Sequence, residues 1–225
     1  MTPSSMIHGL VLVLLSIAAL CMPRLVVASE GYTVEVCNVG KGGLSFSVDG
    51  KFLHMSGGIC PYDGRKFKAF LSTVDPAVRV IKLKVDGGNG PGAMAVGKLI
   101  REGGFDTFVD ARTDVCASAC THLFAAGNKR FYVGARDGLF HVSYGKGGSG
   151  LGYHYPNASH TNADTAETDR YFESKIVPYL QNMLPAEAAQ TVANLMSGNR
   201  TTKMTWLGAK QAHASGIATS LDLPE

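Results

Sequence analysis

Short runs in which apolar and polar residues alternate are separated by longer segments in which apolar residues recur at helical spacing. Alternation with a period of two, as in Val80-Ile-Lys-Leu-Lys-Val85, is typical of a strand, and recurrence every three or four residues is typical of an amphipathic helix. Strands alternating with helices predict an α/β fold built on a parallel sheet with right-handed crossovers. The predicted strands are residues 78–85, 105–110, 130–133 and 138–143, and the predicted helices are 67–73, 93–101, 118–126, 168–183 and 185–196. Residues 204–217 predict a strand, a short helix and a final strand.

The region before this alternation has a different pattern. Residues 32–37 and 44–48 alternate like strands, and Asp49-Gly50 is a strong signal for a tight turn. We therefore interpret residues 29–64 as a small N-terminal β-meander and residues 65–225 as the main domain.

The N-terminus predicts export. Residues 10–22 are apolar almost without interruption, and Val26-Val-Ala28 is a small-residue cleavage pattern, so residues 1–28 predict a signal peptide cut after Ala28. The segment before the apolar run lacks Lys and Arg, and Arg24 lies on the far side of it, which leaves an uncleaved membrane anchor as the alternative. The run is shorter than the ~20 residues of a spanning helix. We expect a periplasmic or secreted protein with no stable membrane anchor after cleavage.

Cysteine usage agrees with export. Removal of the signal peptide leaves four cysteines, an even set that predicts disulfides in an oxidising compartment. The local choice pairs Cys37 with Cys60 and Cys116 with Cys120, although four cysteines permit three pairings. Cys116 and Cys120 have three open interpretations: plain core residues, a disulfide bracing the turn between them, or a redox switch.

Composition and charge limit the classes of molecule that the protein is expected to bind. The 225 residues carry a net charge of +3, without a basic run or an aromatic-interleaved basic face, which argues against nucleic acid. We expect no metal and no cofactor. His154 and His160, flanked by Tyr153 and Tyr155, suggest a metal or ligand site, but no cysteine or carboxylate cluster joins them. A polar lid loop over residues 145–162 is the simpler interpretation, with His154 as a weak candidate for substrate contact.

The candidate chemistry centres on Ser118, in the stretch Cys116-Ala-Ser-Ala-Cys120. A serine hydroxyl becomes a nucleophile when a base takes its proton and donors receive the oxyanion. At a helix start the amide of Ala119 is a free donor, and the glycine turn Gly87-Gly88 can bring a second backbone N–H close. His141, 23 positions after the serine, is the candidate base. The alternatives are that Ser118 only caps a helix and that His141 is an ordinary histidine at a strand end.

The order of these motifs resembles the ClpP/crotonase superfamily, and most closely its secreted or periplasmic ClpP-like proteins. The resemblance spans about residues 65–220 and includes the final stretch from Trp206 to Ile217. It implies a ClpP/crotonase-like spiral of ββα units. It also implies a nucleophile at Ser118, a base at His141, and an oxyanion hole formed by the Gly88 and Ala119 amides. Gly87, like His154, is a weak candidate for substrate contact.

One position departs from the family pattern. ClpP-like proteases place an aspartate a few residues before the aromatic that corresponds to Trp206, to orient the histidine, but residues 197–206 hold no acid. Asn199 is the tentative third catalytic member, because an amide orients the histidine in some cysteine proteases. Thr201 or Thr202 would do so more weakly. Otherwise the site is a dyad or is inactive.

These observations predict an exported serine hydrolase of the peptidase type that acts on a peptide or protein substrate. The alternative is a catalytically degenerate ClpP-fold scaffold or binding protein, for which the missing acid is the argument. Export away from CoA disfavours a crotonase-type acyl-CoA enzyme, and no lysine has a clear claim to a serine–lysine dyad. The resemblance also implies a homo-oligomer.

Overall fold

A computed structural model describes residues 37, 43–143, 148–156, 165–201 and 203–225. These residues all belong to one unit, Thr33–Glu225. The predicted signal peptide and the strand predicted at 32–37, Cys37 excepted, lie outside the described residues. Within the described part no helix is long and apolar enough to cross a bilayer.

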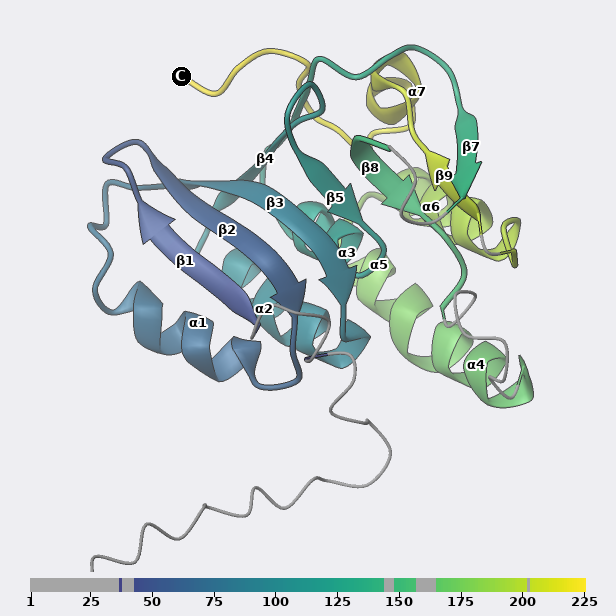
Figure 1. Ribbon diagram of the computed structural model, residues 1–225, viewed down its shortest axis with the longest axis horizontal. Helices are drawn as coiled ribbons and strands as arrows, with labels where there is room; N and C mark the ends of the chain where they lie inside the picture. The colour runs from purple at the N-terminus through teal and green to yellow at the C-terminus, as the bar shows by residue number, and fades with distance from the viewer. Residues whose placement is uncertain (1–36, 38–42, 144–147, 157–164, 202) are drawn as a thin grey trace, which may run out of the picture. The chain divides into compact units, whose positions relative to one another are not determined.

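The described chain forms a mixed α/β structure on one sheet (Figure 1). Its strands are β1 Leu44–Val48, β2 Phe52–Ile59, β3 Val80–Gly88, β4 Asp106–Asp110, β5 Val115–Ala117, β6 Arg130–Val133, β7 Phe140–Ser143, β8 Gly150–Tyr153 and β9 Lys203–Trp206. Its helices are α1 Asp63–Leu71, α2 Gly90–Glu102, α3 Cys120–Ala125, α4 Thr165–Tyr171, the π-helix η1 Phe172–Ile176, α5 Val177–Met183, α6 Ala186–Ser197 and α7 Ala209–Ala214.

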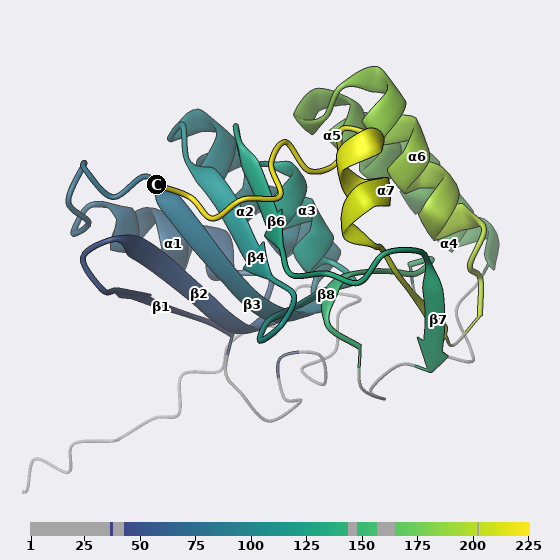
Figure 2. The ribbon, with the colours of Figure 1, turned by 90° about the horizontal axis from the view of Figure 1, so that it is seen from above.

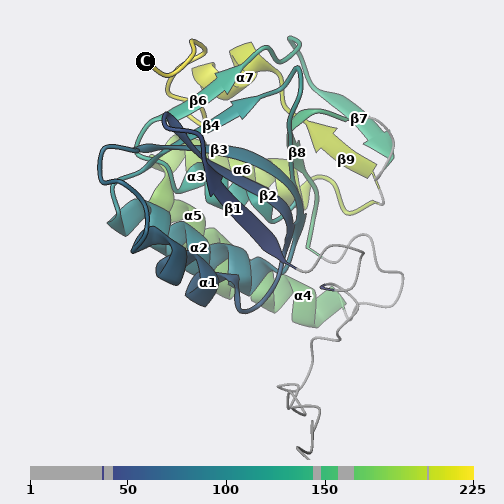
Figure 3. The same ribbon diagram turned by 60° about the vertical axis from the view of Figure 1, so that its left-hand side comes forward.

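The sheet has the strand order β1-β2-β3-β5-β8-β9-β7, with β4 pairing with β3 and with β6. Pairing is parallel from β2 through β3 and β5 to β8, and from β3 through β4 to β6. It is antiparallel between β1 and β2, between β9 and β8, and between β9 and β7. Figure 3 shows β7 next to β9. The predicted α/β class with a largely parallel sheet is confirmed.

The helices α1, α2 and α3 lie on the same side of the strands (Figure 2). The alternation in β3 follows from this arrangement: Ile81, Leu83 and Val85 are fully buried on that side, whereas Lys84 on the other face is exposed. Burying one face of a strand while solvating the other produces the period of two seen in the sequence. The core therefore lies between the sheet and these helices.

The hairpin of β1 and β2 is part of the same sheet. β2 pairs with β3 in parallel from Phe52↔Val80 to Ile59↔Gly88, so this part of the segment predicted as a small meander extends the main sheet at one side. The tight turn lies where the sequence predicts it. Gly50 has φ +89°, and the Asp49 carboxylate accepts the backbone N–H of Phe52.

Three predicted elements differ in the structure. Residues 145–162, predicted as a loop, contain β8, and the helix predicted at 168–183 is divided into α4, the π-helix and α5. The final strand predicted near residue 217 is not formed. Instead the chain makes a single parallel bridge between Phe131 and Ser220.

Both locally predicted disulfides are present. Cys37 is bonded to Cys60, and Cys116 is bonded to Cys120. The prediction of disulfides is confirmed. Of the three possible pairings of the four cysteines, the structure has the local one.

Candidate active site

Ser118 lies in the sharp turn between β5 and α3. Its φ is +55°, a left-handed conformation that no other non-glycine residue in the described part of the chain adopts. Such a backbone costs about 1–3 kcal/mol and persists where the surroundings impose it. The Ser118 N–H donates to the Gly152 carbonyl at 2.8 Å, and the Ser118 carbonyl accepts both the N–H and the hydroxyl of Thr121. These bonds hold the half-buried serine at the carboxyl end of β5.

His154 is the histidine in contact with Ser118. Its Nε2 lies 2.7 Å from the Ser118 Oγ, and the residue is only 8% exposed. The sheet explains the contact: β8 runs parallel to β5, with Ala117 opposite Gly152. Parallel strands end at the same edge of a sheet, so the residues that follow β5 and β8 meet there. The histidine expected to lie in a polar lid is therefore beside the serine.

His141, the base that the sequence predicted, lies elsewhere in the sheet. It is exposed on β7, and its Nδ1 is 3.0 Å from the Thr205 Oγ1. β9 separates β7 from β8, so His141 is on a strand two places, or about 10 Å, from the strand that leads to His154. The structure brings Ser118 together with His154 and does not join it to His141. The reason is that β8, which follows β7 in the chain, is the strand that pairs with β5, so the residue after β8 lies beside the serine.

The glycine pair at the end of β3 lies against the serine turn. Gly87 has φ +107°, and a Cβ there would lie 2.8 Å from both the Ser118 Cβ and the Ala117 carbonyl oxygen. Gly88 has φ +128°, and its Cβ would lie 2.5 Å from the carbonyl oxygen of Ile59. A side chain fits at neither position. Gly87 is therefore the glycine in direct contact with the nucleophile turn, and Gly88 lies against β2.

Ala119 follows the serine and precedes the first residue of α3. It is buried, and among the described residues no acceptor is found for its backbone N–H. First-turn amides lack partners within their own helix. A serine hydroxyl, an imidazole at hydrogen-bond distance and an unpartnered amide next to the serine are the parts that acyl transfer requires.

Comparisons by sequence return no matching family model and no matching curated protein. Comparison by structure returns a mutant of ClpP1 from Listeria monocytogenes, with a TM-score of 0.52 and 16% identity over 78% of this chain and 92% of that chain.

The chain has a ClpP-like fold.

Two further structures have lower TM-scores of 0.49 at 16% identity. The ClpP protease catalytic domain from Plasmodium falciparum matches over 78% of this chain and 88% of that chain. A mutant of the 1510-N membrane-bound stomatin-specific protease matches over 75% of this chain and 77% of that chain.

Asn199, the predicted third member, supports β9 in this ClpP-like fold. It is 6% exposed, and its amide donates to the Lys203 carbonyl at 2.8 Å and to the Thr205 Oγ1 at 2.9 Å. Its carbonyl oxygen accepts the Thr201 hydroxyl. Because Thr205 contacts His141, the side chains of Asn199, Thr205 and His141 form a chain of contacts. The sequence analysis linked Asn199 directly with His141, whereas in the structure Thr205 lies between them and Ser118 contacts a different histidine.

A second histidine, His122, is close enough to His154 to interact with it electrostatically. His122 on α3 is fully buried, and burial together with the nearby His154 lowers its pKa to about 4. Its ring is therefore neutral at pH 7, and no partner for its Nδ1 is found among the described residues. The Tyr179 hydroxyl donates to its backbone carbonyl, which fixes α3 to α5. Within the described part, no group of His, Cys, Asp and Glu is arranged to hold a metal ion.

Proposed function

We propose that this protein is an exported serine hydrolase of the peptidase type, with Ser118 as nucleophile and His154 as general base. The observation that carries the proposal is the 2.7 Å contact between the Ser118 Oγ and the His154 Nε2, made by a serine in a left-handed turn. A nucleophile and base at this distance meet the geometric requirement for proton transfer.

In the proposed reaction, the His154 Nε2 takes the hydroxyl proton as the Ser118 Oγ attacks the substrate carbonyl. This role requires the tautomer in which Nε2 carries a lone pair. The backbone amides of Gly88 and Ala119 are the proposed donors to the oxyanion. The Ala119 N–H is unpartnered, and Gly88 follows Gly87, which packs against the serine turn. The protonated His154 then gives its proton to the leaving group, and water releases the acyl group from Ser118.

The proposed substrate is a peptide or a protein. The support is the fold: the neighbours named above are a ClpP1, a ClpP protease domain and a stomatin-specific protease. We also propose a homo-oligomer, from the same likeness. Two disulfides support a location outside the reducing cytosol.

A fluorophosphonate probe tests this function. The mature protein should be labelled, the adduct should map by mass spectrometry to Ser118, and Ser118→Ala should abolish it. Circular dichroism of Ser118→Ala checks that the fold is intact. Absence of labelling in folded protein, or an adduct at another residue, would overturn the proposal and favour a scaffold or binding role.

A further inference from the structure

The disulfide between Cys116 and Cys120 encloses the proposed nucleophile. Cys116 is the middle residue of β5, Cys120 is the first residue of α3, and Ser118 is midway between them. The two Cα atoms are 5.1 Å apart across a separation of four residues. The covalent link therefore joins the strand and the helix on either side of the left-handed serine.

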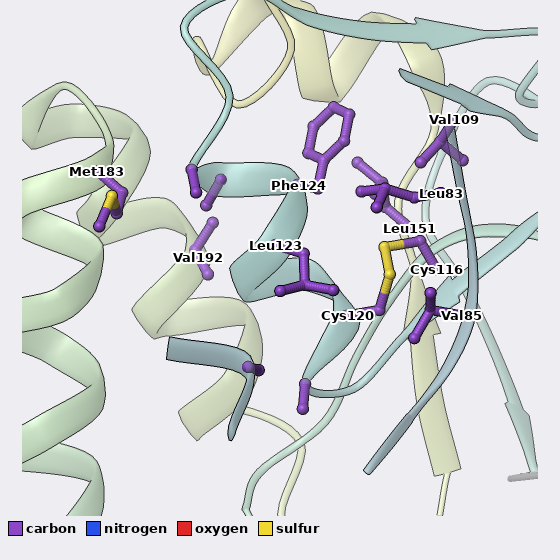
Figure 4. Packing of buried hydrophobic residues seen from close by; sticks show 14 of the residues in the cluster. Leu83, Val85, Val109, Cys116, Cys120, Leu123, Phe124, Leu151, Met183 and Val192 are labelled. Atoms are coloured by element: carbon purple, nitrogen blue, oxygen red, sulfur yellow. A yellow bond between two sulfur atoms is a disulfide. The ribbon is translucent and has the colours of Figure 1, made fainter. Parts of the chain in front are cut away.

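Both ends of the link are fixed in the core. Cys116 pairs with Val85 of β3 on one side and with Leu151 of β8 on the other. Figure 4 shows the two sulfurs among Val85, Leu83, Leu123 and Leu151, and neither cysteine has exposed surface. A displacement of the serine turn would therefore have to move the disulfide against packed side chains.

The turn needs such a constraint. A left-handed conformation is adopted readily by glycine and is strained for serine. The hydrogen bonds around Ser118 reach Gly152 of β8 on one side and Thr121 of α3 on the other, and the two bonds from Thr121 break if α3 shifts relative to β5. The disulfide limits that shift, because it fixes the separation of Cys116 and Cys120.

We propose that the Cys116–Cys120 disulfide is a positioning strap for the nucleophile. It holds the Ser118 Oγ against His154 and the Ala119 N–H next to the reacting centre. The inference rests on the proposed function. Of the interpretations that the sequence left open, a permanent brace fits the burial of both cysteines, since a reductant in solution cannot contact either sulfur in the folded protein.

The experiment compares two double variants. Cys116→Ala/Cys120→Ala removes the strap, and Cys37→Ala/Cys60→Ala is the matched control, because it removes a disulfide that does not enclose Ser118. The readouts are the second-order rate constant of fluorophosphonate labelling and kcat and KM for a peptide that the wild type cleaves. Circular dichroism and thermal unfolding establish that each variant is folded at the assay temperature.

We expect the strap variant to lose roughly tenfold to a hundredfold in labelling rate and kcat, because small displacements of a reacting group have effects of this size. Its KM should be unchanged, and the control should keep the wild-type rate. Cys120→Ala alone removes the same bond but retains one sulfur, so it should match the double variant. Labelling of the strap variant at the wild-type rate, or an equal loss in the control, would overturn the proposal.

A separate readout distinguishes failure of the strap from failure of the proposed function. If the wild type is not labelled at all, the hydrolase proposal fails, and hydrogen exchange then tests the strap. The hydrogen-bonded amides of Ser118 and Thr121 should exchange faster in the strap variant than in the wild type and the control. Unchanged exchange there would overturn the strap, whatever the protein does.

Discussion

The Nε2 of His154 lies 2.7 Å from the Oγ of Ser118, although the two residues are 36 positions apart in the chain. The first residue follows β8 and the second follows β5, and these strands are parallel neighbours. The pair therefore exists because two strands end together at one edge of the sheet. The contact distinguishes His154 from His141, the other histidine considered as the base, because only His154 touches the serine.

Replacing each histidine in turn tests the assignment of the base. We expect His154→Ala to lower fluorophosphonate labelling and peptide cleavage about a hundredfold to ten-thousandfold, the usual contribution of a general base. His141→Ala should stay close to the wild type, since its ring contacts Thr205 rather than Ser118. Loss of activity in His141→Ala with retention in His154→Ala would reverse the assignment.

Gly87→Ala should lower the reactivity of Ser118 in addition to lowering the free energy of unfolding. The added Cβ would lie 2.8 Å from the Ser118 Cβ, and the positive φ costs about 1–2 kcal/mol in any L-residue. Gly50→Ala is the matched control, because Gly50 has φ +89° but no atom within 4 Å of the added Cβ. Both variants should lose stability in urea unfolding, and only Gly87→Ala should lose labelling. Equal activity in the two would argue against contact between the glycine turn and the nucleophile.

The two disulfides should differ in their contribution to stability. They close loops with sequence separations of 23 and 4 residues. The chain-entropy model gives about 3.4 kcal/mol for the longer loop and about 1.9 kcal/mol for the shorter one. Chemical unfolding of the two double alanine variants should therefore show the larger loss for Cys37–Cys60. The order is opposite to the one expected for activity, so a shared order would contradict the entropy argument or the strap.

His122 should make stability depend on pH. Its pKa is about 4 in the folded protein, below the ordinary 6.5, so the unfolded chain binds more protons between these values. The stability contributed by the neutral ring is present above pH 6.5 and is lost as the pH falls towards 4. The slope approaches 1.36 kcal/mol per pH unit for one proton. Urea unfolding of wild type and His122→Phe between pH 4.5 and 7 measures it, and identical slopes would refute the prediction.

Asn199→Ala should reduce stability without removing the nucleophile's reactivity. The buried amide donates to the Thr205 hydroxyl and to the part-buried Lys203 carbonyl, and leaving a buried acceptor such as the Thr205 Oγ1 unpaired costs about 1–3 kcal/mol. Asn199→Ala should therefore unfold at lower urea concentration, while labelling of Ser118 at a temperature where the variant is folded stays near the wild type. A large fall in labelling would restore Asn199 as a catalytic member.

Local physics made several features predictable from the sequence. The alternation in β3 records a sheet with one buried face, and the Asp49-Gly50 dipeptide fixes the hairpin turn. The serine at the start of α3 and the pairing of Cys116 with Cys120 depend on residues four or fewer positions apart. Such signals are short-range, so the chain carries them without its tertiary context.

The choice of histidine was not predictable in this way. β8 has four residues, two of them glycines, and therefore no apolar period by which it differs from a loop. Its burial comes from its neighbours: a Cβ on Gly152 would lie 2.4 Å from the Met204 Sδ of β9, and Gly152 is opposite Ala117 of β5. Without β8, the first strand after the serine that carries a histidine is β7, with His141.

The sequence by itself determined the α/β class and the Asp49-Gly50 turn, and it offered the local disulfides as one of three pairings, because these signals follow from the conformational preference or spacing of neighbouring residues. Tertiary structure decided that His154 contacts Ser118, that Thr205 lies between Asn199 and His141, and that β2 extends the main sheet. These are outcomes of strand order and register. Strand pairing joins residues far apart in the chain, and no local pattern records which strands become neighbours.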